Sequence, residues 1–310
     1  MSSLPTVMIM QPHLGRLGMT LGNTYRVLNY WEQPGEAELA EVQAMVVAGE
    51  FPLDKALIER LPKLGLVACF TAGYDGIDVA WTKARGLKAS HAPSVNHEDV
   101  ADHAIGLITG HIRHIVAGDR ELRAGLWHAG AKTLTPSLAG KRVGLVGLGG
   151  IGEAVARRCE PMRMSIAWWG PRAKPGAAWP RAESLEALAR DSDILVVACK
   201  VDETNRGMIS KTVIEALGPD GLLVNVSRGQ VIDEDAMIAA LKDGRLGGAA
   251  LDVFVQEPTP AERWADVPNT TLTPHTAGAT FASVQKMVEL MLANLAAFFA
   301  GEELKTPIED

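Results

Sequence analysis

The sequence of 310 residues predicts an α/β protein made of two domains, each built on a parallel β-sheet. Short apolar runs alternate with helical patterns in the first third of the chain, and the same alternation begins again after residue 140. A connector at residues 125–140, rich in Gly, Thr, Pro and Ser, separates the two series. A chain of this length can give each domain a hydrophobic core of its own.

The first series predicts strands where apolar runs are short and helices where apolar residues recur at helical spacing. Strands are expected at residues 6–10, 25–29, 44–47 and 64–70, and a helix at 53–61. A long helix is expected at about 95–116, because Val100, Ala104, Leu107 and Ile108 lie on one face of a helix with these bounds.

The second series predicts six strands with helices between them, which is typical of a doubly wound sheet. The strands are expected at residues 142–146, 165–169, 194–198, 222–226, 248–253 and 270–273, and the helices at 150–159, 184–190, 211–217 and 233–242. A last helical pattern, at 283–300, is expected to return to the first domain. The domains would then be 1–97 with 283–310, and 98–282.

A glycine-rich turn follows the first strand of the second series. It reads Gly147-Leu148-Gly149-Gly150-Ile151-Gly152. In such turns the first glycine permits the tight bend, the second lets the backbone approach a pyrophosphate, and the third lets the helix pack closely. The N–H groups at the helix start then bind the phosphates. The segment predicts a Rossmann-type dinucleotide domain; the alternative is a loop that only turns a corner.

Composition narrows the classes of partner. The net charge of −7 argues against a nucleic acid or an anionic membrane, since both favour a basic face. No apolar run approaches the roughly 18 residues that a membrane span needs, and the first residues lack the pattern of a secretory signal. Cys69, Cys159 and Cys199 lie in apolar patterns, so we expect reduced thiols in a cytoplasmic protein.

Three polar residues follow apolar strands of the second series, where ligands bind in open α/β sheets. Arg228 precedes a glycine, and its guanidinium could bind a carboxylate or carbonyl; a surface ion pair is the alternative. Glu257 and His275 each follow a later strand. A carboxylate bonded to one imidazole nitrogen raises the basicity of the other, so this pair predicts an acid–base couple rather than a structural histidine.

With the glycine turn before them, Arg228, Glu257 and His275 resemble the catalytic set of the D-isomer-specific 2-hydroxyacid dehydrogenases. Within that family the chain is most similar to glyoxylate, hydroxypyruvate and hydroxyphenylpyruvate reductases. The resemblance covers nearly the whole chain and includes residues 72–78, 93–104, 204–209 and 244–254. It implies a smaller, flavodoxin-like α/β substrate domain beside the dinucleotide domain, and a homodimer.

The resemblance also implies an activity, the reduction of a small 2-oxo acid to the D-2-hydroxy acid with NAD(P)H. Arg228 would bind the substrate's carboxylate and carbonyl, His275 would donate a proton to the carbonyl oxygen, and Glu257 would hold His275 in its charged form. Backbone N–H groups would bind the substrate carboxylate at Ala72, Gly73 and Tyr74. Cofactor contacts are implied for the glycine turn, Thr204, Val226 and Asp252.

The residues after the second strand of this series bear on cofactor choice. NAD-selective domains usually carry Asp or Glu about 20 residues after the glycines. Here Gly170 stands at that point, followed by Pro171, Arg172 and Lys174. The missing carboxylate removes repulsion from a 2′-phosphate, and the two cations could neutralise one. We therefore expect NADPH to be preferred and NAD to be possible; solvated loop charges are the alternative.

Other patterns point to alternatives. His97 to His103 and the pair His111 and His114 have spacings seen in metal sites, but acidic residues also favour a helix start, so no metal is expected. Trp127 lies in the connector, which in relatives can reach a partner subunit. The competing functions are a dehydrogenase of the superfamily that acts on a substrate other than a hydroxy acid, and a nicotinamide-sensing interaction protein.

Overall fold

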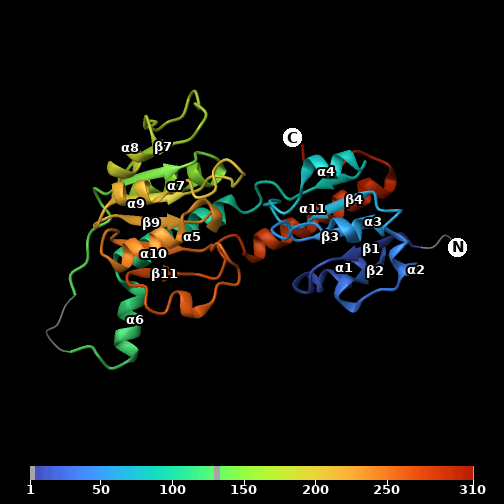
Figure 1. Cartoon of the computed structure of the whole chain (residues 1–310), viewed down its shortest axis with the longest axis horizontal. Coiled ribbons are helices and arrows are strands. Elements are labelled where there is room, and N and C mark those ends of the chain that lie inside the picture. Colours follow the sequence, from blue (N-terminus) through green and yellow to red (C-terminus); the bar gives the residue numbers. More distant parts are fainter. Residues whose placement is uncertain (1–3, 129–132, 310) are drawn as a thin grey trace. The chain divides into compact units, whose positions relative to one another are not determined.

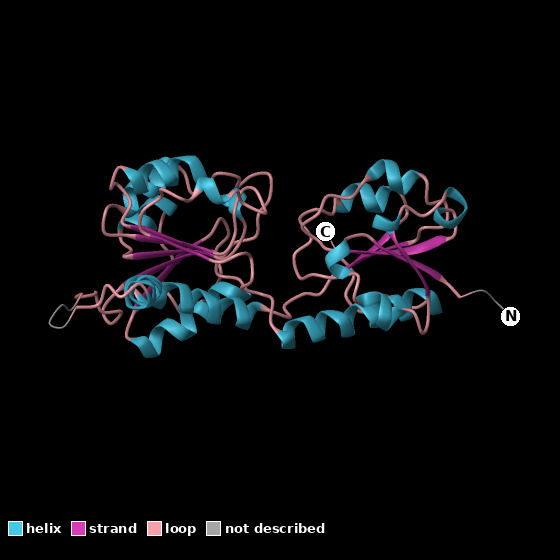
Figure 2. Ribbon diagram, turned by 90° about the horizontal axis from the view of Figure 1, so that it is seen from below, coloured by secondary structure: helices cyan, strands magenta, loops and turns pink. Residues whose placement is uncertain are grey.

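The computed structural model describes residues 4–128 and 133–309, and the chain divides into two compact units (Figure 1). Unit 1 comprises the residues up to Asn96 together with those from Phe281 onward. Unit 2 is the continuous segment His97–Thr280. Each unit holds a parallel sheet with helices on both faces, as Figure 2 shows. The predicted fold class is thereby confirmed.

Unit 1 contains a five-stranded sheet in the order β2-β1-β3-β4-β5, which is the order of flavodoxin-like folds. The strands are β1 (Thr6–Ile9), β2 (Arg26–Asn29), β3 (Val42–Val47), β4 (Leu66–Cys69) and β5 (Lys88–Ser90). The helices are α1 (Leu17–Leu21), α2 (Glu36–Leu39), α3 (Lys55–Glu59), α4 (Val79–Ala84) and α11 (Phe281–Ala300), with 3-10 turns η1 (Pro12–Leu14) and η2 (Tyr30–Glu32).

Helix α11 completes the core of unit 1 although it comes from the far end of the chain. Its apolar face buries Met287, Met291 and Leu295 in one cluster with side chains of β1, β3 and β4. At Gly65, a Cβ atom would lie 2.7 Å from the ring of Phe298, so the helix packs directly on the backbone before β4. The core of unit 1 therefore depends on residues from both ends of the sequence.

Unit 2 contains a six-stranded sheet in the order β11-β10-β9-β8-β6-β7. The strands are β6 (Arg142–Val146), β7 (Ser165–Trp169), β8 (Ile194–Val197), β9 (Leu222–Asn225), β10 (Gly248–Leu251) and β11 (Thr270–Leu272). The chain adds β7 on one side of β6 and β8 on the other. The strand order therefore reverses at β6, and in open α/β sheets ligands bind beyond the strand ends at such a point.

The helices of unit 2 cover both faces of this sheet. They are α5 (His97–Ile112), α6 (Ile115–Arg123), α7 (Gly150–Cys159), α8 (Leu185–Arg190), α9 (Lys211–Leu217) and α10 (Glu234–Lys242), with 3-10 turns η3 (Glu160–Met162), η4 (Gly229–Val231) and η5 (Ala261–Arg263). The apolar positions predicted for α5 are all buried. Helix α5 packs against α7 and against strands β9, β10 and β11.

Some predicted elements differ from the structure. The single helix expected at 95–116 is wrong, because the chain breaks at His114, where φ is +50°, and continues as α6. The short strand β5 and the short helices α1, α2 and α4 were not predicted, since none has a clear apolar period in its few residues. Several strands also end one or two residues earlier than expected.

Two further findings concern the described residues only. None of the helices over 4–128 and 133–309 is long and apolar enough to cross a bilayer. In the same ranges no three His, Cys, Asp or Glu side chains are grouped as a metal site would require.

Candidate active site

The glycine turn between β6 and α7 has the geometry of a phosphate-binding turn. Gly147 has a φ of +96°, and a Cβ there would lie 2.9 Å from the backbone of Cys199. A Cβ on Gly152 would lie 2.2 Å from the carbonyl oxygen of Gly147. By contrast, a Cβ on Gly149 would meet nothing within 4 Å. The first and third glycines are thus required by packing, whereas the second borders open space.

Helix α7 begins at this open side. Its N-cap is Gly149, which offers no side chain to the first N–H groups of the helix. Those N–H groups have no acceptor within the helix, and together with the helix dipole they form a site for an anion. The turn therefore fits the pyrophosphate of a dinucleotide.

The loop after β7 contacts the glycine turn. Gly170 is buried, and its carbonyl accepts a 2.7 Å hydrogen bond from Arg181. Arg172 is exposed. The Lys174 ammonium donates to the carbonyl oxygen of Leu148 at 2.7 Å and forms an ion pair with Glu153 in the first turn of α7. Lys174 is thus not simply a solvated loop charge, because it ties this loop to the turn.

Arg228 follows β9 in a loop held by a buried amide. The Asn225 side chain accepts hydrogen bonds from the N–H and hydroxyl of Ser227 and donates to the carbonyl of Arg228 at 2.9 Å. The next residue, Gly229, lies so near the following loop that a Cβ would be 1.9 Å from the carbonyl carbon of Phe254. These contacts fix the backbone that carries the guanidinium.

Asp252, directly after β10, holds the loop that carries His275 through hydrogen bonds. Its carboxylate accepts from the Thr273 hydroxyl at 2.6 Å and from the N–H groups of Thr276 and Ala277 at 2.9 Å each. Its carbonyl accepts from the N–H of His275 at 2.8 Å. Burial alone would raise the pKa of Asp252, but the hydrogen bonds, with His103 first among them, outweigh burial and hold it below its ordinary value.

His275 and Glu257 form a close pair. The imidazole Nδ1 lies 2.6 Å from a Glu257 carboxylate oxygen, and the other oxygen accepts from the Phe254 N–H at 2.9 Å. The hydrogen bond to Glu257 raises the pKa of His275, against the opposing effects of burial and of the Arg228 charge. Because Nδ1 is bound to the carboxylate, proton exchange with another molecule falls to Nε2.

The pKa of Glu257 responds to the same neighbours. Burial raises it, but the hydrogen bonds from His275 and Phe254 and the positive charge of Arg228 outweigh burial, so the pKa stays below its ordinary value. Arg228 thus acts electrostatically on both partners. The structure brings the predicted trio together within unit 2.

Two residues near this trio were not predicted. Glu234, at the start of α10, is buried and accepts from the Val255 N–H at 3.0 Å and from Arg263 at 2.6 Å, so it fastens the loop that carries Glu257. His103 on α5 lies 2.9 Å from the Thr273 hydroxyl through its Nε2 atom. Since that hydroxyl donates to Asp252, the histidine must donate to it. Nothing in the sequence pattern marks Glu234 or His103, which lie on helices, as a contact of these loops.

The other predicted cofactor residues are spread over unit 2. Val226 is buried directly after β9, and Leu148 is buried in the glycine turn. Thr204 is exposed, and both its N–H and its hydroxyl donate to the carboxylate of Asp202. The side chain of Thr204 is therefore committed to its own turn.

The predicted substrate loop lies in unit 1, directly after β4. The carbonyl of Ala72 accepts from the His91 imidazole at 3.0 Å, and that of Gly73 accepts from the Thr71 hydroxyl at 2.8 Å. The Tyr74 ring packs edge-on against His91, with the ring centroids 4.7 Å apart. The backbone of this loop is thus tightly held.

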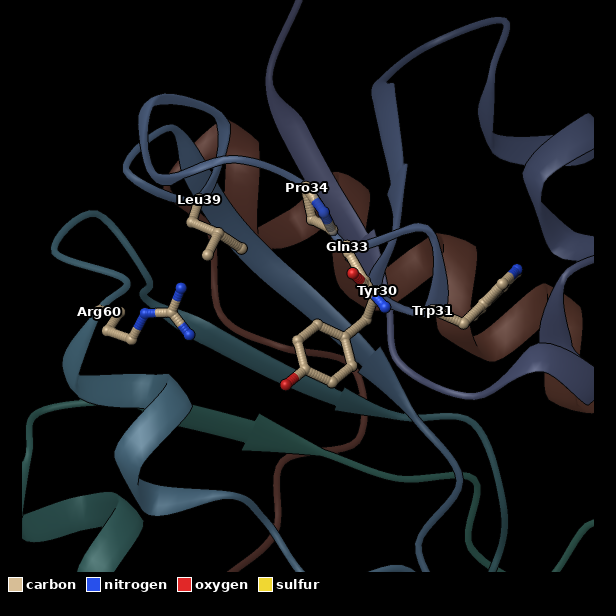
Figure 3. A pocket seen from close by; sticks show the side chains of 6 residues that line it. All are labelled: Tyr30, Trp31, Gln33, Pro34, Leu39 and Arg60. Atoms are coloured by element: carbon tan, nitrogen blue, oxygen red, sulfur yellow. The ribbon is translucent and has the colours of Figure 1, made fainter.

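A surface pocket of unit 1, shown in Figure 3, contains none of the predicted site residues. It is lined by Tyr30, Trp31, Gln33, Pro34, Leu39 and Arg60. The Arg60 guanidinium is already paired with Glu36, so the pocket offers no uncommitted charge of Arg60 to a ligand.

Comparison with known proteins identifies the family. Residues 105–277 match the D-isomer specific 2-hydroxyacid dehydrogenase, NAD binding domain. The chain is 39% identical to glyoxylate/hydroxypyruvate reductase A of Arabidopsis thaliana, over 97% of this chain and 98% of that protein. It is 38% identical to the hydroxyphenylpyruvate reductase of Plectranthus scutellarioides, with the same shares covered.

Solved structures agree with this result. A 2-hydroxyacid dehydrogenase of Ketogulonicigenium vulgare superposes with a TM-score of 0.92 at 37% identity, covering 99% of each chain. An NADPH-dependent glyoxylate/hydroxypyruvate reductase of Sinorhizobium meliloti, solved with NADP and malonate, gives a TM-score of 0.92 at 35% identity, covering 99% of this chain and 97% of that one.

The chain therefore belongs to the D-isomer specific 2-hydroxyacid dehydrogenase family. Within that family it is an NAD(P)-dependent oxidoreductase that acts on 2-oxo or 2-hydroxy acids.

Proposed function

We propose that the protein reduces glyoxylate, hydroxypyruvate or a related small 2-oxo acid to the D-2-hydroxy acid, with NADPH as the preferred cofactor. The observation that carries the proposal is the 2.6 Å hydrogen bond between His275 and Glu257, on a loop fastened by Asp252. This pair provides a proton donor near neutral pH. The relatives named above as glyoxylate/hydroxypyruvate reductases support the substrate class.

Each member of the trio has a distinct role in this reaction. The nicotinamide, when bound, supplies the hydride that reaches C2 of the substrate. The Nε2 atom of His275 donates a proton to the carbonyl oxygen as negative charge develops there. Arg228 binds the substrate's carboxylate and carbonyl oxygens, which stabilises that charge. Glu257 orients the imidazole and favours its charged form.

Other residues bind and do not react. The N–H groups of Ala72, Gly73 and Tyr74 bind the substrate carboxylate. Among the residues of unit 1 that the structure describes, none accepts a hydrogen bond from the N–H group of Ala72 or of Gly73. Unit 2 would then serve as the dinucleotide domain, and residues 1–97 with 283–310 as the substrate domain. Asp252 would lie near the nicotinamide.

The cofactor preference rests on the loop after β7. No carboxylate follows the strand at Gly170, where an NAD-selective domain would place one. Arg172 is exposed and Lys174 reaches the glycine turn, so both cations lie in the loop that would meet a 2′-phosphate. The NADPH-dependent relative of S. meliloti supports the same choice.

The test is a panel of 2-oxo acids assayed with each cofactor. Consumption of reduced nicotinamide is followed with glyoxylate, hydroxypyruvate and phenylpyruvate, using NADPH and NADH in parallel. We expect the highest kcat/KM with a small 2-oxo acid and NADPH. Equal or better efficiency with NADH would reject the cofactor preference, and no turnover of any 2-oxo acid would reject the proposed reaction.

A further inference from the structure

Three successive carbonyl groups of the loop after β4 are tied to the body of unit 1. The carbonyl of Thr71 accepts from the Ala92 N–H at 3.1 Å, that of Ala72 from the Nδ1 atom of His91 at 3.0 Å, and that of Gly73 from the Thr71 hydroxyl at 2.8 Å. These peptide groups are trans, so each C=O and the N–H of the same group point in opposite directions. The N–H groups that follow are therefore turned away from the anchors.

Successive backbone N–H groups that are held in fixed directions can together bind an anion. A hydrogen bond to a peptide carbonyl also polarises the N–H of the same peptide group, which strengthens it as a donor. The anchors on the carbonyl side thus act on the direction and strength of the donors without touching the ligand themselves.

The Thr71 hydroxyl anchors the carbonyl of Gly73. It accepts from the N–H of Gly49 at 2.9 Å and donates to the carbonyl of Gly73. The two loops are so close that a Cβ on Gly49 would lie 2.0 Å from the Gly73 oxygen. The hydroxyl therefore links two backbone segments that pack tightly against each other, and the Cys69 thiol also donates to the Gly73 carbonyl at 3.4 Å.

His91 is the second anchor. Since the carbonyl of Ala72 can only accept, the proton of this hydrogen bond belongs to Nδ1. The backbone of His91 is fixed in turn by Thr306, whose hydroxyl donates to the His91 carbonyl at 2.6 Å. The buried side chain of Asn294 on α11 bonds both the N–H and the hydroxyl of Thr306. A chain of hydrogen bonds thus runs from the returning helix to the substrate loop.

We propose that Thr71 and His91 are positioning residues that set the affinity for the carboxylate of the 2-oxo acid. They do so by fixing the directions of the peptide groups of residues 71–74, and with them the N–H groups of Ala72, Gly73 and Tyr74. This proposal rests on the proposed function, in which those N–H groups bind the substrate. Because the carboxylate is unchanged during hydride transfer, loss of an anchor weakens ground state and transition state alike.

The test compares two disruptive variants with their conservative counterparts. Thr71→Val and His91→Leu remove the donors, whereas Thr71→Ser keeps the hydroxyl and His91→Asn places an amide donor near the position of Nδ1. For each variant, KM and kcat are measured with glyoxylate, and the Kd of NADPH is measured by fluorescence titration. Thr82→Val is the matched control, because the hydroxyl of Thr82, a buried threonine of unit 1, also donates to a backbone carbonyl, that of Asp78.

We expect Thr71→Val and His91→Leu to raise the KM for glyoxylate roughly tenfold, the effect of a lost hydrogen bond, with kcat within about threefold of the parent. The Kd of NADPH should stay unchanged, and Thr71→Ser and His91→Asn should recover most of the lost affinity. An unchanged KM in both disruptive variants, an equal rise in Thr82→Val, or no recovery in the conservative variants would overturn the proposal. A parent protein that reduces no 2-oxo acid would instead reject the proposed function itself.

Discussion

The charge of His275 depends chiefly on the carboxylate of Glu257. In the proposed reaction, reduction requires the protonated imidazole, which is present below the pKa of His275 and is lost as the pH rises through it. Glu257 raises that pKa. In Glu257→Gln we therefore expect the alkaline limb of kcat/KM to move to lower pH, with a loss of activity at neutral pH that acidification partly restores.

The measurement is the pH profile of kcat/KM for glyoxylate with saturating NADPH. Glu262→Gln, which removes an exposed acid in the nearby turn η5, is the control and should keep the parent profile. The same alkaline limb in parent and Glu257→Gln would contradict the role given to Glu257. The contribution of the His275–Glu257 pair to folding stability depends on pH in the same direction. A histidine whose pKa is raised in the folded state stabilises the protein at low pH, and this contribution is lost as the pH rises through the raised pKa.

A second charge pair bears on the cofactor. Glu153 holds the Lys174 ammonium beside the glycine turn and cancels its charge. In Glu153→Gln the ammonium keeps its hydrogen bond to the Leu148 carbonyl but loses the opposing charge. Both cofactors should then bind more tightly, and NADPH more so because of its additional phosphate. We expect the ratio of the NADH Kd to the NADPH Kd to rise by roughly threefold to tenfold, which corresponds to about 0.65 to 1.4 kcal/mol.

Fluorescence titration with each cofactor measures this ratio directly. The matched control is Glu186→Gln on α8, another first-turn acid of unit 2 but on a different helix from the one that follows the glycine turn. A ratio that stays at the parent value in Glu153→Gln would show that Lys174 does not act on the 2′-phosphate.

At the level of elements, the loops after β9 and β10 depend on one glycine. A Cβ on Gly229 would lie 1.9 Å from the Phe254 carbonyl carbon, and backbone cannot rotate away as a side chain can. In Gly229→Ala the two loops must separate, and these loops carry Arg228 and Glu257. We expect a loss of about 1–3 kcal/mol in the free energy of unfolding, as for other overpacked sites, and a larger relative loss of kcat/KM.

Urea unfolding and steady-state kinetics on the same preparation test this expectation. Gly106→Ala is the control, because that glycine lies inside α5 and a Cβ there would meet nothing within 4 Å. In Gly106→Ala the free energy of unfolding should stay unchanged or rise by up to about 1 kcal/mol, because alanine has the higher helix propensity. A Gly229→Ala protein with parent stability and kinetics would show that the loops are not packed as described.

The elements that the sequence predicted are those with a strong local signal. Strands β6, β8 and β9 are continuous apolar runs, and the glycine turn has fixed spacing, so each could be read without knowledge of its neighbours. Helix α4 is short and is defined mainly by Asp78, whose side chain caps it at the Trp81 N–H. The break at His114 arises from a left-handed backbone that no residue type there announces.

In the candidate site, too, the residues with a local sequence signal were predicted and those without one were not. Arg228, Glu257 and His275 were predicted because each follows a strand, and a resemblance gave them roles. His103 contacts Thr273 across 170 residues of sequence, and Glu234 contacts the Val255 N–H across 21. Such contacts depend on how helices and loops pack in three dimensions, and no spacing along the chain encodes them.

The two units of the molecule differ in how the chain forms them: unit 2 is one continuous segment, whereas unit 1 consists of two segments from opposite ends of the sequence. Unit 2 has buried apolar clusters on both faces of its own sheet. Unit 1 needs α11, whose Met287, Met291 and Leu295 complete the cluster over β1, β3 and β4. We therefore expect the isolated segment 97–280 to fold cooperatively and to bind NADPH, whereas the isolated segment 1–96 should not fold.

Circular dichroism, urea unfolding and NADPH fluorescence titration of each segment test this prediction. Segment 1–96 exposes the apolar face that α11 covers, so we expect a non-cooperative transition and aggregation. Joining residues 281–310 to its end through a flexible linker is the matched control, and it should restore a cooperative transition because the missing core residues return. Segment 97–280 should bind NADPH with a Kd close to that of the full chain and should reduce no 2-oxo acid, because it lacks the loop at residues 71–74. A cooperatively folded segment 1–96 would contradict the structural role given to α11.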